Sequence, residues 1–222
     1  MLRSNRNNRN NQNGKKTPNR RLGIEKLEPR AMLAAITIGD TSAMEGGSNL
    51  KFLDRFVSLG SGGLTQSAGS TFGPDGNLYV ANVKDQAIFR YNGVTGSYID
   101  TFVSPGSGSL NSYLEPAFGP DGNLYVSSFA GNKVLRYSGS SGAFMDVFVG
   151  GLSSPVGITF GSDGSLYIAN QGTNEVLRYS NSVLSPFVPA GSGGLSAPRK
   201  SVFGSDGKLY VASQGTGQVL RY

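Results

Sequence analysis

Four copies of one nine-residue phrase constrain the fold of this chain more than any other feature of its sequence. The phrase reads Phe-Gly-Pro/Ser-Asp-Gly-x-Leu-Tyr-Val/Ile and occupies residues 72–80, 118–126, 160–168 and 203–211, at spacings of 46, 42 and 43 residues. A second phrase ending in Arg-Tyr follows each copy, and its Arg always lies 18 residues after the Phe of the first phrase. A constant internal distance beside loops of varying length indicates a repeated structural unit.

Each repeat predicts a small sheet of four antiparallel strands. The Gly-Pro-Asp-Gly or Gly-Ser-Asp-Gly segment is typical of a type I turn, with its last Gly at positive φ, between a first strand ending in Phe and a second strand Leu-Tyr-Val. The Arg-Tyr phrase is the third strand, and fourth strands are expected over residues 98–103, 144–149 and 184–188. Since blades of a β-propeller repeat every ~40 to 50 residues, the predicted fold is all-β, a β-propeller of four four-stranded blades over residues 51–222.

The two ends of the repeat region leave the last blade open to two interpretations. Residues 51–57 resemble a fourth strand that no first three strands precede, whereas the chain stops at Tyr222, after a third strand. If residues 51–57 pair with that third strand, they complete the fourth blade and close a ring without free edges. The alternative is a fragment of a larger propeller, whose uncovered blade faces favour dimerisation or aggregation.

The excess of basic over acidic residues is confined to the first 30 residues of the chain. They hold nine Lys/Arg and two Glu, a net charge of +7, while the other 192 residues hold eleven basic and twelve acidic residues, a net charge of −1. We interpret residues 1–35 as a disordered basic leader of low complexity and residues 36–50 as a linker. The repeat region has no electrostatic reason to bind nucleic acid, and no apolar run reaches the ~18 residues of a membrane span.

The chain contains no Cys, His or Trp. This excludes a disulfide framework, a Ser-His-Asp or Cys-His active site, and a metal centre built on imidazole or thiolate, and we predict no cofactor. The turn aspartates offer one carboxylate per turn, too few for a calcium loop, so they are interpreted as turn residues. The four repeated Arg residues are interpreted as structural, paired with acids or stacked on the adjacent Tyr. The Tyr of each first phrase is expected to pack between blades.

The candidate ligand site lies in the loops at one mouth of the propeller, because these loops vary between copies while the scaffold repeats. Arg199 and Lys200 are expected at the same mouth, in the loop that leads from a fourth strand back to the next first strand. The candidate ligand-binding residues are Lys84, Asp85, Gln86, Tyr113, Glu115, Phe129, Asn132, Gln171, Asn174, Glu175 and Gln214. No catalytic residue and no metal ligand is assigned.

Two resemblances to known families follow from these motifs. The Asp-Gly-Asn/Ser-Leu-Tyr-Val hairpin, the Asn-x-Val-Leu-Arg-Tyr strand (from Asn132 and Asn174) and the Gly-rich return resemble the NHL-type propeller family over residues 51–222. In place of the acid that is frequent in that family after the second strand, this chain has polar residues without charge. Residues 21–35, with Leu-Glu-Pro-Arg followed by Ala-Met-Leu-Ala-Ala, resemble the LEPR-XLL segment near the start of many large exported bacterial proteins.

These resemblances imply an exported protein, located outside the cell or at the cell surface. The first hypothesis is a binding or scaffold module that contacts a protein or glycan partner. The alternative is a metal-dependent lactonase-like or hydrolase-like enzyme, because streptogramin lyases and some gluconolactonases are similar propellers. The absence of His argues against the lyase version, and a lactonase version would depend on Glu115 and Glu175. A third possibility is an inactive fragment of a larger propeller protein.

Overall fold

A computed structural model describes residues 53–112 and 114–222 of the chain, all within the compact unit Ile36–Tyr222. The predictions for the leader, the linker, residues 51 and 52, and Tyr113 lie outside the described residues.

The described residues form four antiparallel sheets in chain order, and this confirms the predicted β-propeller. Each sheet is one blade, and hydrogen bonds join its strands in sequence order. Blade 1 consists of β1 (Ser67–Phe72), β2 (Leu78–Asn82), β3 (Ala87–Tyr91) and β4 (Tyr98–Val103). Blade 2 consists of β5 (Leu114–Phe118), β6 (Leu124–Ser128), β7 (Lys133–Tyr137) and β8 (Phe144–Val149). Blade 3 consists of β9 (Pro155–Phe160), β10 (Leu166–Asn170), β11 (Glu175–Ser180) and β12 (Val183–Val188). Blade 4 consists of β13 (Pro198–Phe203), β14 (Leu209–Ser213) and β15 (Gln218–Arg221).

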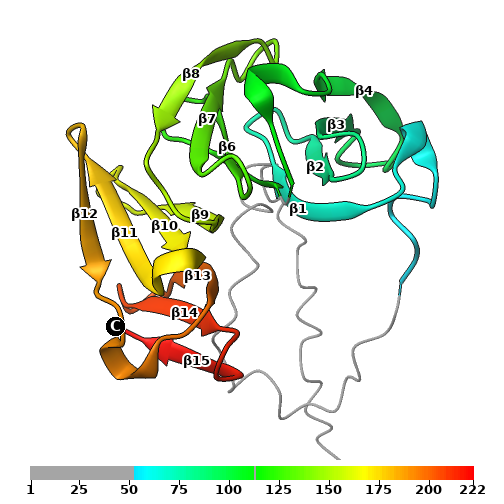
Figure 1. Cartoon of the computed structure of the whole chain (residues 1–222). Helices are drawn as coiled ribbons and strands as arrows, with labels where there is room; N and C mark the ends of the chain where they lie inside the picture. Colours follow the sequence, from blue (N-terminus) through cyan, green and yellow to red (C-terminus); the bar gives the residue numbers. More distant parts are fainter. Residues whose placement is uncertain (1–52, 113) are drawn as a thin grey trace, which may run out of the picture. The chain divides into compact units, whose positions relative to one another are not determined.

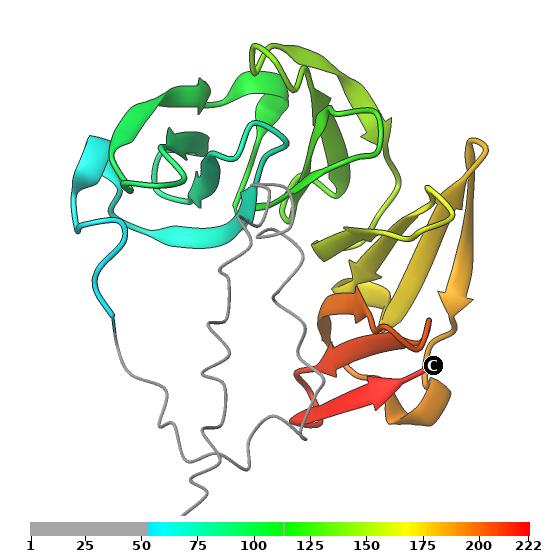
Figure 2. The ribbon, with the colours of Figure 1, turned by 180° about the vertical axis from the view of Figure 1, so that it is seen from behind.

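The blades follow one another with their first strands innermost. β1 packs beside β5, β5 beside β9, and β9 beside β13, whereas β13 and β1 do not pack together in this way. Blade 1, drawn in cyan and green, therefore lies at one end of the series and blade 4, drawn in orange and red, at the other (Figure 1 and Figure 2). Short 3-10 turns η3 (Ser61–Gly63), η4 (Ser107–Ser109) and η6 (Ser192–Gly194) lie in loops that lead into the first strands, and η5 (Gln171–Thr173) follows β10.

The turn between the first two strands of each blade has the predicted geometry. In blade 1 the amide of Gly76 donates to the carbonyl of Gly73 over 3.0 Å, and Gly76 has a φ of 79°. The equivalent glycines also have positive φ, which a residue without Cβ adopts at no steric cost. Their φ values are 76° at Gly122, 74° at Gly164 and 74° at Gly207.

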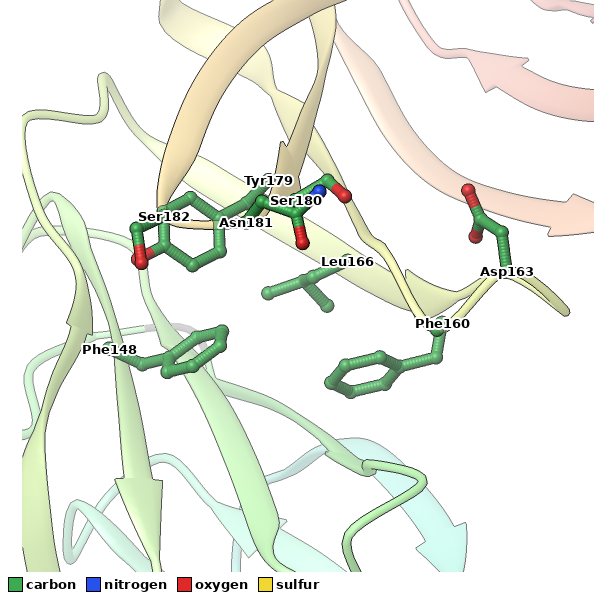
Figure 3. Close-up of a pocket in the computed structure, with 9 residues that line it drawn as sticks. Phe148, Phe160, Asp163, Leu166, Tyr179, Ser180, Asn181 and Ser182 are labelled. Atoms are coloured by element: carbon green, nitrogen blue, oxygen red, sulfur yellow. The ribbon is translucent and has the colours of Figure 1, made fainter.

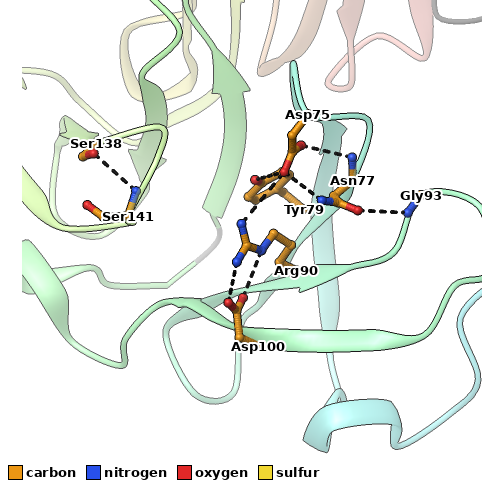
Figure 4. A network of polar contacts seen from close by, with 8 residues as sticks. All are labelled: Asp75, Asn77, Tyr79, Arg90, Gly93, Asp100, Ser138 and Ser141. Atoms are coloured by element: carbon orange, nitrogen blue, oxygen red, sulfur yellow. Dashed lines mark hydrogen bonds and ion pairs between the residues drawn. The ribbon is translucent and has the colours of Figure 1, made fainter. Parts of the chain in front are cut away.

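The turn aspartate lies in the turn, as predicted, and the structure adds that it organises a polar network (Figure 4). In blade 1, Asp75 accepts hydrogen bonds from the backbone and side-chain amides of Asn77 and, over 3.0 Å, from the hydroxyl of Tyr79. Burial by itself would raise the pKa of Asp75, but these hydrogen bonds and the charge of Arg90 outweigh it, so the pKa lies below its ordinary value of 3.8. The ionised carboxylate therefore stabilises the folded turn.

Arg90, Arg136 and Arg178 form structural ion pairs, as predicted. The first two stack on Phe rather than on the adjacent Tyr. Arg90 in β3 donates from Nε and Nη2 to the two oxygens of Asp100 in β4, over 3.1 and 2.5 Å. Its guanidinium lies 5.0 Å from the ring centre of Phe102. Arg136 forms the same bidentate pair with Asp146 in blade 2. In blades 1 and 2 the fourth strand is thus held to the third by charge as well as by the backbone ladder, whereas Arg178 of blade 3 pairs with the turn residue Asp163.

The Tyr of each first phrase packs between blades where a following blade exists. The ring of Tyr79 lies edge-on against Phe102 of its own blade and Phe118 of the next blade, with both centroid distances 4.9 Å. Tyr125 and Tyr167 repeat this arrangement one and two blades further on. Buried apolar residues of adjacent blades form shared clusters around these rings, so each blade needs its neighbour to cover its face.

The predicted closing strand over residues 51–57 is not formed in the described part of the chain. Blade 4 has three strands, and residues 53–57 adopt no strand conformation and do not pair with β15. The segment packs against blade 1, where Val57 joins the apolar cluster of Val80, Phe89 and Tyr91. The physical reason that it does not pair with β15 is that β13 does not pack beside β1, so blade 4 is not brought next to it. Of the two interpretations, closure within one chain is not formed by the described residues.

Because the pKa values of the turn aspartates are lowered in the folded protein, we expect the protein to lose stability in acid. A group whose pKa is lower in the folded state stabilises the fold above its unfolded pKa, and this contribution disappears as the pH falls through the folded pKa. We therefore expect urea unfolding to show a free energy that decreases below about pH 4, and Asp75→Asn to weaken that decrease. The same acid dependence in wild type and variant contradicts the assignment. The lowered pKa values belong to Asp75, Asp121, Asp163 and Asp206.

Candidate functional site

One position on the innermost strands breaks the repetition of the scaffold. It is occupied by Gly69 in β1, Glu115 in β5, Gly157 in β9 and Lys200 in β13. Consecutive members are separated by the repeat spacings of 46, 42 and 43 residues, so they are equivalent places in the four blades. The turns and packing residues are nearly the same in each copy, whereas this position holds an acid, a base and two glycines.

The acid and the base of this set meet across the inner strands. Lys200 Nζ donates to Glu115 Oε1, and the two residues are 85 positions apart in the sequence. The Glu115 side chain is 14% exposed, whereas that of Lys200 is 58% exposed. The carboxylate is thus held within the inner strands, while more than half of the Lys200 side chain is open to solvent.

The two glycines make room for this pair. A Cβ added to Gly69 would overlap the carboxylate of Glu115, and a Cβ added to Gly157 would overlap the carbonyl oxygen of Arg199. The glycine in β9 thereby lets β13 approach closely enough for Lys200 to reach blade 2. We call Gly69, Glu115, Gly157 and Lys200 the inner-strand set.

Several predicted loop residues lie at the same edge of the blades as Glu115 and Lys200. At this edge the first strands begin and the second strands end. Lys84 and Gln214 are exposed, and Gln171 and Phe129 are partly buried. The amide Nε2 of Gln171 donates to Oε1 of Gln214 over 3.4 Å, so these two side chains link blades 3 and 4. Glu175, in contrast, begins β11 and is half-buried. Tyr113 lies outside the described residues.

Three other predicted residues hold the loop backbone in place. Gln86, Asn132 and Asn174 occupy equivalent positions before the third strand and have φ values of 54°, 52° and 58°. Asn132 Oδ1 accepts from the amide of Ser154 over 2.8 Å, and Asn174 Oδ1 accepts from the amide of Ala197 over 2.6 Å. These two contacts tie the loops of blades 2 and 3 to the chain that enters the next blade, so the side-chain oxygens of both Asn residues already have partners. Gln86 instead donates from Nε2 to the carbonyl of Val83 over 2.6 Å, and its buried Oε1 has no hydrogen-bond partner.

The uncharged residues that end the second strands have a related structural role. Asn82 donates to Asp85 Oδ2 over 2.7 Å. The carboxylate of Asp85, a predicted site residue, therefore already has a partner within its own loop. Ser128 and Ser213 each exchange hydrogen bonds with the backbone of a neighbouring loop, and Asn170 accepts from the amide of Ser153. All four side chains are buried. Their hydrogen bonds shape the loops without supplying charge.

A cavity of about 250 Å³ lies at the opposite edge of the blades (Figure 3). Phe148 of blade 2 and Phe160, Leu166 and Tyr179 of blade 3 form its apolar walls, and Asp163 lies at its polar side. No sequence motif indicates this cavity, because its walls are ordinary packing residues of two different blades. It is separate from every predicted site residue.

Two findings concern metal ions and membranes. In residues 53–112 and 114–222, no three acidic side chains gather closely enough to hold a metal ion. The same residues include no helix with the length and apolarity needed to cross a bilayer.

The comparisons with known proteins relate this chain to other propellers. No protein-family model and no curated protein matches the sequence. A catalytically inactive virginiamycin B lyase from Staphylococcus aureus, solved with quinupristin, is 17% identical with a TM-score of 0.55; the match covers 70% of this chain and 55% of the lyase. An auxiliary nutrient binding protein from Bacteroides ovatus is 12% identical with a TM-score of 0.58, covering 70% of this chain and 47% of that protein. A putative gluconolactonase is 17% identical with a TM-score of 0.55, covering 70% of this chain and 62% of that protein.

Fold and comparisons together define the class: the chain is a β-propeller repeat protein. The match spans about half the length of the virginiamycin B lyase and of the nutrient binding protein. At these identities the likeness concerns the fold alone, since one propeller fold supports both binding proteins and enzymes.

Proposed function

We propose that this chain is an exported propeller of the NHL type that acts as a binding or scaffold module outside the cell or at the cell surface. Its partner is a protein or a glycan, held at the edge of the blades where Glu115 and Lys200 meet. The ion pair between these two residues is the observation that carries the proposal.

The ion pair supports a binding role because the scaffold does not require it. The repeated structural contacts, such as the turn aspartates and the Arg-Asp pairs, occur in several blades, whereas the Glu115–Lys200 pair occurs once. Lys200 is 58% exposed, so solvent screens the pair from this side, and screened ion pairs contribute little to stability, about 0 to 1 kcal/mol. Differences between copies of a repeat that stability does not demand are expected where a ligand is recognised.

The surrounding groups suit a ligand rich in hydroxyl or amide groups. Gln171 and Gln214 present amides that both donate and accept, and Lys84 and Lys200 present exposed ammonium groups. Sugar hydroxyls and peptide backbones offer the matching donors and acceptors. The export part of the proposal rests separately on the LEPR-XLL-like segment at residues 21–35.

The proposal is tested with two screens, a glycan microarray and a displayed peptide library, on wild type and on the double variant Glu115→Gln/Lys200→Gln. The double variant removes both charges without leaving either unpaired. Because a hydrogen bond to a charged group contributes about 1.5 to 3 kcal/mol, binders selected on wild type should bind the variant about 10- to 100-fold more weakly.

The matched control is Lys208→Gln, which removes an exposed lysine from the turn between β13 and β14 at the opposite edge. Binding that survives the double variant, or no binder in either screen, contradicts the proposal. Calcium analysis of the same preparations addresses the enzyme alternative: stoichiometric calcium that Glu115→Gln removes would favour the lactonase-like reading. We expect no stoichiometric calcium, because the Glu115 carboxylate is already paired with Lys200.

A further inference from the structure

The face of blade 4 that points away from blade 3 is uncovered. Val219 in β15 is 71% exposed, whereas its equivalents Ile88, Val134 and Val176 in the other blades are completely buried. In those blades a fourth strand pairs with the third, as Ile88 pairs with Val103 and Val134 with Val149. Among the described residues, no strand pairs with the outer edge of β15.

The segment 53–57 lies against blade 1 where the fourth strand of a preceding blade would lie. A Cβ added to Gly96 would overlap the carbonyl oxygen of Phe56, and a Cβ added to the equivalent Gly142 would overlap the carbonyl oxygen of Phe102 in β4. Phe56 and Phe102 are 46 residues apart, as are Gly96 and Gly142. The segment therefore contacts blade 1 in the same way as β4 contacts blade 2. It differs from β4 in that no third strand pairs with it.

The charges of the two ends are complementary. Asp54 corresponds to Asp100 and Asp146, which hold the Arg residues of blades 1 and 2 in bidentate pairs. Arg221 corresponds to those Arg residues, and within the described part of the chain it forms no such pair with a fourth-strand aspartate. Asp54 and Arg221 are both exposed.

The aromatic residues of the two ends are complementary as well. Inside the propeller, a Tyr such as Tyr79 packs between a fourth-strand Phe and the first-strand Phe of the next blade. Tyr210 of blade 4 is the equivalent Tyr and has neither neighbour among the described ring contacts. Phe56 and Phe72, the two matching Phe positions, are 39% and 40% exposed at the other end.

We propose that a second copy of this chain joins these ends, with residues 53–57 of each copy pairing as the missing fourth strand of blade 4 in the other. If residues 53–57 paired with β15 of the same copy, β13 would pack beside β1 as β9 packs beside β5. In the structure β13 and β1 do not pack together in this way. In the dimer, Val57 lies opposite Val219 and Asp54 opposite Arg221, in the register of β3 with β4. Phe56 and Phe72 of one copy enclose Tyr210 of the other.

The dimer has two identical junctions related by a two-fold axis. Each copy contributes its N-terminal segment to one junction and β15 to the other, so the contacts close after two copies and the outer edge of each β15 is paired. Each junction buries apolar surface that a single copy exposes at Val219, Phe56 and Phe72.

The experiment measures molar mass by light scattering during size-exclusion chromatography of the full 222-residue chain. We expect about twice the chain mass of 23.3 kDa. Asp54→Arg places two Arg residues opposite each other at both junctions, and Arg221→Asp places two Asp residues there. Like charges directly opposite destabilise strand pairing, so each variant alone should dimerise at least about tenfold more weakly.

Mixing the two variants distinguishes a second copy from closure within one copy. In a mixed dimer each junction regains one Arg and one Asp, so an equimolar mixture should dimerise like wild type. Closure within one chain gives no such rescue. A monomeric wild type, or a mixture that stays monomeric, overturns the proposal.

Two further variants complete the test. Lys208→Asp, at an exposed position of the turn between β13 and β14, makes the same change of charge as Arg221→Asp and should remain dimeric, because Lys208 takes no part in the proposed strand pairing. Val219→Glu introduces a charge that mixing with either variant cannot compensate, so it should remain monomeric in every mixture. Circular dichroism of each variant checks that the fold is retained.

Discussion

Tyr125→Ala is expected to lower the free energy of unfolding by about 3 to 5 kcal/mol, the range for removal of a large buried aromatic side chain. Tyr125 in β6 is 3% exposed, and its ring lies 4.7 Å from Phe148 of blade 2 and 4.9 Å from Phe160 of blade 3. Alanine leaves a cavity between two sheets that the rigid strands cannot close. The measurement is urea unfolding followed by circular dichroism.

Tyr125→Phe is the matched control for this prediction. It keeps the ring and removes only the hydroxyl that donates to Asp121 over 2.9 Å. Burial first, and then the nearby Asp121, raise the pKa of Tyr125 to about 12, so the hydroxyl is a donor at neutral pH. The control should cost about 1 kcal/mol. Equal losses in the two variants would show that the polar network, rather than packing between blades, supports this region.

Gly139→Ala is expected to cost about 3 kcal/mol, near the upper end for overpacking. A Cβ at this position would overlap the carbonyl oxygen of Gly122, in the turn between β5 and β6. The obstacle is backbone, which cannot turn aside as a side chain can. The amide of Gly139 also donates to Asn123 Oδ1 over 3.2 Å, so moving it weakens the turn. The measurement is again urea unfolding.

Gly150→Ala is the control for the glycine prediction. A Cβ there would meet only Val147 Cγ1, at 3.9 Å, and its φ lies outside the left-handed region. The substitution should change stability by less than about 1 kcal/mol, in the stabilising direction. If Gly139→Ala proves as mild as the control, the two hairpin turns of blade 2 are not packed as the structure has them. The same large loss is expected of Gly93→Ala in blade 1, where the overlap is with Gly76.

Much of the fold could be predicted because each blade carries its own local signals. The Asp-Gly turn predicted where β1 ends and where β2 begins. The fourth strand predicted for blade 1, over residues 98–103, agrees with the structure. Interior packing was harder to predict. Tyr79 was expected between blades and is found there, yet the ring that stacks on Arg90 is Phe102 on another strand.

The candidate site was predictable only in outline. Residues in the expected loops lie at one edge, but the oxygens of Asn132 and Asn174 are engaged with the backbone of other loops. The partnership of Glu115 with Lys200 could have been suspected from their equivalent places in the repeat. Their contact depends on the distance between blades 2 and 4, and the repeat spacing in the sequence does not determine that distance.

The strands, turns and number of blades follow from short-range chemistry, because turn residues and alternating apolar positions act within a few residues of each other. Which ends meet is a different matter. Residues 53–57 carry the pattern of a fourth strand, but whether they pair with β15 depends on the angle between successive sheets, and that angle results from packing of whole blade faces. Only the three-dimensional arrangement therefore separates Asp54 from Arg221 within one chain and unites Glu115 with Lys200.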